Sequence, residues 1–276
     1  MESSASVSTS GREHLGWIVR ESGPEGSDHT LLLLPGALAS AIFYDDLVAE
    51  LMVNASIRFV ATTLPGFGRT QALDDVSVEE YARTAGALAR DLGCDAVVGH
   101  SLGANVALEM AAAGTFAGPV VLISPSFSRE DESKFPRALD RLSRVLGHLP
   151  YSLMFKLIGP AMRSSLPPHR SDELIADLRN NDPRFVRRQT RLYLEYLDRH
   201  GSLTPRLCTS GVRAWVVFGD SDDIGLKDSE REELEACPTV TVVTIPDAGH
   251  FTLNQKPAQV GEIVLKALAS ASPVSR

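Results

Sequence analysis

The feature that most constrains the fold is a series of short apolar runs, each ending in glycine or proline and followed by a polar or helical stretch. In chain order the runs are GWIVRE, TLLLLPG, IRFVATTLPG, DAVVGHS, PVVLISPS, VRAWVVFGD and TVTVVTIPD. Near-continuous Val, Ile and Leu is typical of strands buried on both faces, as in a parallel sheet covered by helices. The sequence therefore predicts a doubly wound α/β fold.

Apolar residues recur at helical spacing between these runs. Residues 77–93 show the pattern, with Ser77 and Glu80 in the positions of a capping box. Residues 101–114 are rich in strong helix formers, and a last helix is expected from about Pro257. These helices would cover the sheet.

One region breaks the alternation of strands and helices. From about residue 127 to residue 208 the sequence has several helical stretches and no strand pattern. A helical block of that length predicts an insertion folded over the edge of the sheet. The expected organisation is a flexible tail over 1–14, an α/β core over 15–126 and 209–276, and a helical cap, or lid, over 127–208.

The charge of the chain excludes some partners and is unevenly distributed. A net charge of −8 argues against a nucleic-acid binder, which usually has a basic surface. The 127–208 segment has 15 Lys and Arg against 10 Asp and Glu, so it is positive while the remainder is strongly negative. Solvated helix faces explain this excess, and attraction of anionic substrates is the alternative.

The lack of a recognisable targeting signal and the pattern of cysteines predict a cytoplasmic protein. The apolar runs are shorter than the ~20 residues that span a bilayer, and the polar N-terminus has no apolar signal region. Cys94, Cys208 and Cys237 form an odd set without metal-ligand spacing, which predicts reduced thiols. The expected partner is a small-molecule substrate, with no nucleic acid and no membrane, and the oligomeric state stays open.

A candidate nucleophile lies where a predicted strand turns into a helix. Gly99-His100-Ser101-Leu102-Gly103 fits the pattern G-x-S-x-G. The turn is sharp, so the positions two before and two after the serine must be small. It would present the Ser101 hydroxyl at the carboxyl edge of the sheet, where open α/β folds bind ligands.

A serine hydroxyl needs a base, and His250 is the best candidate among the seven histidines. His250 lies in IPDAGHF, a short loop after the last predicted strand, and so at the same edge as Ser101. His100 adjoins the serine, but a packed or hydrogen-bonded turn residue explains it better. The others fall in the tail, a loop or the predicted cap: His14, His29, His148, His169 and His200.

The base needs a carboxylate that fixes its tautomer and stabilises the imidazolium. Asp220, Asp222 and Asp223 compete in VVFGDSDDIGL, after the penultimate predicted strand. Asp220 directly follows the strand, so Asp222 is preferred, with Asp223 second. A solvated acidic loop is the alternative explanation for one or two of these acids.

The oxyanion of a tetrahedral intermediate needs backbone donors. One should be the N–H of Leu102, at the start of the helix after the nucleophile. The other should be the N–H of Ala37, in the loop after TLLLL where Gly36 lets the chain turn.

Five motifs in this order resemble the α/β-hydrolase superfamily, in its capped serine-nucleophile branch of esterases and lactonases. They are LLLLPGALAS, LPGFGRT, VVGHSLGAN, FGDSDDI and PDAGHF. The resemblance implies an eight-stranded, mostly parallel sheet, a triad of Ser101, Asp222 and His250, and no cofactor or metal. Serine at the nucleophile position disfavours the dehalogenase and epoxide-hydrolase branches. Pro35 and Thr63 depart from the family pattern of His and Asp, which leaves open what braces the oxyanion loop.

The leading hypothesis is cleavage of a carboxylic ester, lactone or thioester of a small, mainly apolar substrate through an acyl-serine intermediate. A carbon–carbon bond hydrolase with the same triad is one alternative, although its extended glycine-rich oxyanion loop is absent. A ligand-binding protein with little turnover is another. Pocket candidates are mostly aromatic residues that more often pack a cap: Leu38, His100, Phe127, Tyr151, Phe155, Tyr193 and Phe251.

Overall fold

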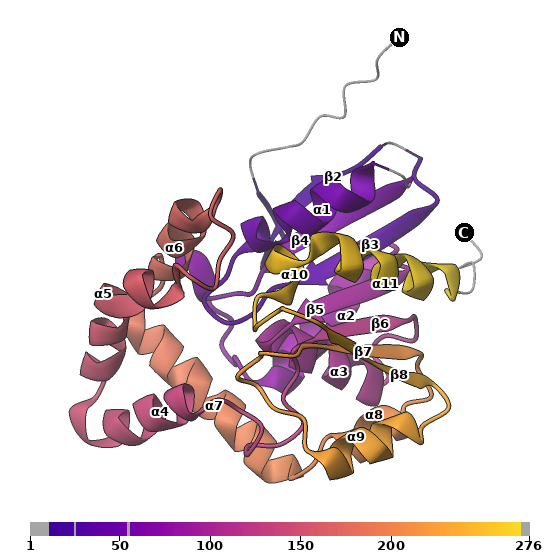
Figure 1. The fold of residues 1–276 in the computed structure, drawn as a ribbon. Helices are drawn as coiled ribbons and strands as arrows, with labels where there is room; N and C mark the ends of the chain where they lie inside the picture. Colours follow the sequence, from indigo (N-terminus) through magenta and orange to yellow (C-terminus); the bar gives the residue numbers. More distant parts are fainter. Residues whose placement is uncertain (1–10, 25, 54–55, 272–276) are drawn as a thin grey trace.

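An eight-stranded sheet forms the centre of the computed structural model, which describes residues 11–24, 26–53 and 56–271 (Figure 1). Its strand order is β1-β2-β4-β3-β5-β6-β7-β8. β2 pairs antiparallel with both β1 and β4, and every other pair is parallel. The prediction of a doubly wound, mostly parallel sheet is confirmed.

The central strands are buried because helices cover both faces of the sheet. In β3, Leu32 and Leu34 join one apolar cluster, whereas Leu31 and Leu33 join the other. This alternation follows from the two-residue period of a strand. The strands are β1 (Arg12–His14), β2 (Trp17–Ser22), β3 (His29–Leu34), β4 (Ile57–Thr63), β5 (Ala96–His100), β6 (Val120–Ile123), β7 (Ala214–Gly219) and β8 (Val240–Ile245).

The covering helices divide between the two faces. Helices α2, α3, α8 and α9 supply side chains to one apolar cluster, and α1, α10 and α11 supply the other. The elements are η1 (Ala41–Tyr44), α1 (Asp45–Met52), η2 (Phe67–Arg69), α2 (Val78–Asp91), α3 (Leu102–Ala112), α8 (Thr204–Thr209), α9 (Asp228–Glu235), α10 (Thr252–Gln255) and α11 (Pro257–Ala269).

The predicted ends of α2 are confirmed by its capping. The Ser77 hydroxyl accepts a hydrogen bond from the backbone N–H of Glu80 at 3.2 Å. After the helix, Gly93 adopts φ +64°, the left-handed conformation that glycine provides at helix ends.

Five helices lie between β6 and β7, and we call the first four of them, which precede α8, the inserted helices. They are α4 (Lys134–Leu146), α5 (Leu149–Met162), α6 (Ser171–Arg179) and α7 (Pro183–His200). Figure 1 shows them gathered at one end of the sheet. The part of the chain that the structure describes contains no helix long and apolar enough to cross a membrane.

Two predictions need correction. Residues 12–14, assigned to a flexible tail over 1–14, form β1 because they pair with β2; residues 1–10 lie outside the described residues. Cys208 and Cys237 form a disulfide rather than free thiols, because the fold brings their Cα atoms within 5.7 Å. Cys94 is free and buried. The cysteines therefore no longer argue for a reducing compartment.

Candidate active site

Ser101 occupies the sharp turn between β5 and α3. Its backbone has φ 51° and ψ −119°, a combination that a residue with a side chain rarely adopts. Its N–H donates to the carbonyl of Ile123 in the neighbouring strand at 2.8 Å. The surrounding backbone thus holds Ser101 in a strained conformation, as a nucleophile elbow requires.

The glycines of the G-x-S-x-G motif are needed because backbone crowds this turn. A Cβ on Gly103 would lie 2.1 Å from the carbonyl oxygen of Leu34, and a Cβ on Gly99 would lie 2.3 Å from that of Gly103. Neither position has room for a methyl group. The steric reason given for the motif is confirmed.

We expect Gly103→Ala to destabilise the fold by about 2 kcal/mol or more, because backbone atoms must move to admit the methyl group. Urea unfolding measures the change in the free energy of unfolding. Gly225→Ala is the matched control, since a Cβ there meets nothing within 4 Å. Equal stability of Gly103→Ala and the wild type would contradict this account of the elbow.

His250 and Asp222 are joined by a hydrogen bond from Nδ1 to Oδ1 at 3.1 Å. The Asp222 side chain is only 1% exposed. The Asp222 carboxylate also accepts hydrogen bonds from the Ser124 hydroxyl, at 2.5 Å from Oδ2, and from the Ile224 N–H, at 2.9 Å from Oδ1. These contacts hold a buried carboxylate behind the imidazole.

The contact between His250 and Asp222 also shifts the pKa values of both side chains. Burial would raise the pKa of Asp222, but the hydrogen bonds from His250, Ser124 and Ile224 outweigh it and the net pKa is lowered. Burial would lower the pKa of His250, but its hydrogen bond to Asp222 and the charge of that carboxylate raise the net pKa. Asp222 therefore remains ionised and favours the imidazolium form of His250.

The two competing acids lie elsewhere. Asp220 is exposed and accepts from the N–H of Ala248 at 3.3 Å, and its own N–H continues the ladder to β8. Asp223 is exposed to solvent. The structure therefore pairs His250 with Asp222 and not with either neighbour.

His100 supports the loop that carries His250. Its Nε2–H donates to the carbonyl of His250 at 2.8 Å, and the two rings lie 4.9 Å apart. Burial, together with the neighbouring His250, lowers the pKa of His100 to about 3, so its ring stays neutral. His100 is thus a packed, hydrogen-bonded turn residue.

His100 links the segments that carry Ser101 and His250. His100 precedes Ser101 in the chain, and its ring contacts that of His250 at an interplanar angle of 47°. Within the described residues no hydrogen bond joins the Ser101 hydroxyl to His250. Catalytic hydrogen bonds are often long in free enzymes and tighten when substrate binds.

The loop after β3 lies directly against the elbow. A Cβ on Gly36 would be 3.1 Å from the Cβ of Ser101 and 3.0 Å from Nδ1 of His100. The chain then turns, with the Ala39 N–H donating to the Gly36 carbonyl at 3.3 Å. Ala37 is therefore exposed at a turn beside Ser101. Leu102, which directly follows Ser101, is the first residue of α3, and the N–H groups of a first helical turn lack partners within the helix.

Side chains distant in sequence brace this loop. Thr63 Oγ1 accepts from the N–H of Ala41 at 3.2 Å, and Asp177 accepts from the N–H of Ser40 at 2.8 Å. Asn181 donates to the carbonyl of Leu38 at 2.8 Å. Two of these braces come from α6 and the residues after it, and sequence reasoning found neither.

The predicted pocket residues separate into two groups. Phe251 is half-buried, and its ring lies 5.9 Å from His100 and 5.6 Å from His250, so it borders the site. Leu38, in the turn after β3, is also half-buried. Phe127 was expected in a pocket but is wholly buried in the core.

The other pocket candidates pack among the inserted helices. Tyr151 and Tyr193 are buried, and Phe155 packs against the same core. Tyr193 donates from its hydroxyl to Asn105 of α3 at 3.1 Å. No three His, Cys, Asp or Glu side chains come together as a metal site in the part of the chain described.

A family comparison settles the affiliation of the chain. Residues 31–263 match the model of the alpha/beta hydrolase family. The chain belongs to this family. No curated protein matches this hydrolase in a sequence comparison.

Solved structures share the fold of this hydrolase at low sequence identity. An esterase from Exiguobacterium antarcticum superposes with a TM-score of 0.73 at 13% identity, covering 92% of this chain and 96% of its own. An esterase from Rhodococcus sp. ECU1013 gives 0.72 at 18%, covering 93% and 95%. A thermophilic esterase from Thermogutta terrifontis gives 0.69 at 21%, covering 92% and 93%. At these identities the likeness shows the fold alone.

In this hydrolase a buried carboxylate that the sequence did not reveal lies near His250. Glu132 accepts from the Ser126 hydroxyl at 3.1 Å and from the Ser133 N–H at 2.9 Å. Burial raises the pKa of Glu132, and its charge adds to the raised pKa of His250. Its position in the polar stretch SREDES gave no signal of burial.

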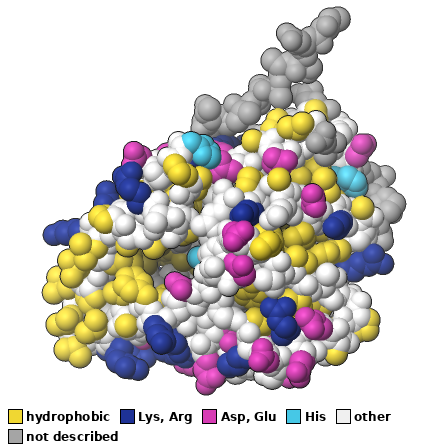
Figure 2. All heavy atoms as spheres, in the orientation of Figure 1, with side chains coloured by type: hydrophobic (Ala, Val, Ile, Leu, Met, Phe, Trp, Pro, Cys, Tyr) yellow, Lys and Arg dark blue, Asp and Glu magenta, His cyan; other side chains and the backbone are white. Residues whose placement is uncertain are grey.

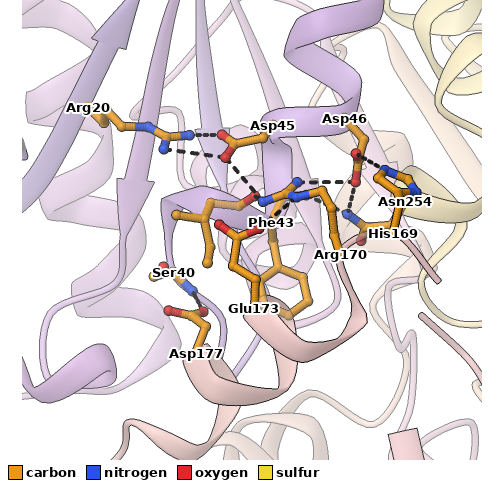
Figure 3. A network of polar contacts seen from close by, with 11 residues as sticks. Arg20, Ser40, Phe43, Asp45, Asp46, His169, Arg170, Glu173, Asp177 and Asn254 are labelled. Atoms are coloured by element: carbon orange, nitrogen blue, oxygen red, sulfur yellow. Dashed lines mark hydrogen bonds and ion pairs between the residues drawn. The ribbon is translucent and has the colours of Figure 1, made fainter. Parts of the chain in front are cut away.

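A polar network ties the inserted helices to the core beside the site (Figure 3). The Arg170 guanidinium, at the start of α6, bonds Asp45 and Asp46 of α1, each at 3.2 Å, and the carbonyl of Ile42 at 3.1 Å. Asn254, four residues after His250, donates to Asp46 at 3.1 Å. The network therefore connects α6, α1 and the segment after the histidine loop.

Proposed function

We propose that the protein is a serine hydrolase that cleaves a carboxylic ester, lactone or thioester through an acyl-Ser101 intermediate. The observation that carries the proposal is the hydrogen bond between His250 and a buried, ionised Asp222, at the sheet edge where Ser101 is held in a strained elbow. Membership of the alpha/beta hydrolase family and the fold shared with esterases support it.

Acylation uses five groups in the proposed scheme. His250 takes the proton of the Ser101 hydroxyl through Nε2, and Oγ attacks the carbonyl carbon of the substrate. Asp222 stabilises the resulting imidazolium. The N–H groups of Ala37 and Leu102 bind the oxyanion of the tetrahedral intermediate. The intermediate collapses when His250 gives the proton to the departing alcohol or thiol.

Deacylation repeats the sequence with water. His250 removes a proton from the water, whose oxygen attacks the acyl carbon. The same N–H groups bind the second oxyanion, and His250 returns the proton to Oγ of Ser101. The products are a carboxylic acid and the free enzyme, so the proposed reaction requires no cofactor.

The inserted helices are proposed to cap this site and to select the substrate. Asp177 of α6 and Asn181, just after it, hold the turn that carries Ala37. The half-buried Leu38 and Phe251 offer apolar surface next to the candidate triad. A small, mainly apolar acyl or ring group fits such a lining.

A substrate screen tests the reaction class. Aryl esters of increasing acyl length, lactones and acyl thioesters are incubated with the wild type, and the released acid is measured. Turnover of at least one class, strongest for short apolar acyl groups, is expected. Stoichiometric binding without turnover in any class would instead favour a ligand-binding protein on the hydrolase fold.

The raised pKa of His250 predicts that kcat/KM falls on the acidic side with a midpoint above pH 6.5, the ordinary value for histidine. The base must be neutral to accept a proton, so activity is lost as the pH falls through the raised pKa. A pH profile of aryl ester hydrolysis measures it. The profile of His148→Gln, at the start of α5, should be unchanged, and a wild-type midpoint well below pH 6.5 would contradict the assignment.

A further inference from the structure

Large apolar side chains are exposed along α4 and α5, and we call this surface the α4–α5 patch. Each is at least half exposed, up to 87% for Val145. Figure 2 shows hydrophobic side chains gathered over these two helices, with Lys and Arg at their margin. The patch comprises Phe135, Leu142, Val145, Leu146, Leu149, Leu153 and Leu157.

Helical spacing aligns these side chains instead of scattering them. Leu149, Leu153 and Leu157 recur every four residues on α5 and form one stripe. On α4, Leu142 and Leu146 have the same spacing. The opposite face of α5 is used for packing, since Tyr151 and Ile158 are buried. A contiguous apolar surface of this kind marks an interaction site.

The charges around the patch are positive. Between residues 134 and 162 the basic residues are Lys134, Arg137, Arg141, Arg144 and Lys156, and the one acid in the sequence is Asp140. Asp140 is 2% exposed and pairs with Arg144 and Arg191, each at 3.2 Å. The surface charge of these helices is therefore cationic, although the whole chain carries −8.

A cationic hollow of about 680 Å³ adjoins α4. Its charged lining comes mainly from arginine: Arg129, Lys134, Arg137, Arg141 and Arg144, with Asp140. A guanidinium group can donate two parallel hydrogen bonds to the oxygens of one phosphate, so the lining of the hollow suits phosphate groups. An apolar surface and a cationic hollow thus lie side by side on α4.

We propose that the α4–α5 patch binds the surface of a bilayer containing anionic phospholipid. The apolar side chains would enter the boundary between headgroups and acyl chains, while the cations contact lipid phosphates. A second copy of the chain fits less well, because two copies meeting through the patch would bring their cationic margins together. The protein would bind the bilayer surface without crossing the bilayer. The proposal therefore replaces the sequence-based expectation that the protein has no membrane partner.

Vesicle sedimentation tests the proposal on the full-length protein. The wild type is expected to sediment with mixed phosphatidylcholine and phosphatidylglycerol vesicles, much less with phosphatidylcholine alone, and less as salt is raised. The double variant Val145→Asp, Leu149→Asp should lower the partition coefficient about tenfold or more, since it removes apolar insertion and adds repulsion. Arg137→Glu with Arg141→Glu should lower it similarly.

Two controls separate the patch from other causes. Val53→Asp replaces a valine that is 76% exposed at the end of α1, away from the patch, and should bind like the wild type. Ser101→Ala should also bind like the wild type, so vesicle binding and the proposed reaction can fail independently. Circular dichroism checks that each variant is folded.

Three results would overturn the proposal. The wild type could fail to sediment with anionic vesicles, or the patch variants could sediment as the wild type does. Alternatively, light scattering without lipid could show a dimer that Val145→Asp, Leu149→Asp dissociates, which would assign the patch to a second copy of the chain.

Discussion

Ser101→Ala is expected to lower kcat/KM for aryl esters by about 10⁴-fold or more. The variant keeps the N–H groups of Ala37 and Leu102 but loses the atom that forms the acyl intermediate, so only residual catalysis by binding and oxyanion stabilisation remains. Initial rates with a substrate that the wild type hydrolyses measure the change.

The control for this variant is Ser270→Ala, at the end of α11. Its hydroxyl donates to the carbonyl of Ala267 in the last turn of the same helix, so the rate of this variant should match that of the wild type. The unfolding transition of Ser101→Ala should stay close to that of the wild type. A folded Ser101→Ala variant with undiminished activity would show that another group is the nucleophile.

Asp222→Asn is expected to lower kcat/KM by about 10³-fold or more while leaving the protein folded. The amide can keep a hydrogen bond to His250 but loses the charge that stabilises its imidazolium. The pKa of His250 should fall, since Asp222 contributes most to raising it, and the acidic limb of the pH profile should move to lower pH. Rates across pH measure both effects.

The matched control is the neighbouring acid. Asp223→Asn removes an exposed carboxylate one residue away, and we expect less than about a twofold change because exposed charges act weakly across solvent. If Asp223→Asn had the large effect and Asp222→Asn the small one, the acid would be wrongly assigned.

Local patterns predicted the fold and the candidate triad because each pattern has a local physical cause. Runs such as TLLLL are buried on both faces, and Leu31 to Leu34 alternate between two apolar clusters. Gly103 and Gly99 are required by backbone contacts at the turn itself. His250 and Asp222 follow parallel strands whose carboxyl ends share an edge, which is why order in the sequence predicted their pairing.

Contacts between distant segments could not be predicted from the sequence. Asp177 meets the Ser40 N–H across 137 residues, and no local pattern encodes that contact. The Cys208–Cys237 disulfide depends on how α8 and α9 pack. Burial of Glu132 within a polar stretch likewise depends on tertiary structure. Helical periodicity identified α4 and α5 but could not say that one apolar stripe faces solvent.

The most direct test of the central claim is labelling with a fluorophosphonate, in which the activated serine oxygen displaces fluoride from phosphorus. Mass spectrometry of the wild type should show one adduct per chain, on the peptide that contains Ser101. Ser101→Ala should show none, and His250→Ala should be labelled far more slowly. A folded wild-type protein that resists the probe, or an adduct on another residue, would contradict the assignment of Ser101 as the nucleophile.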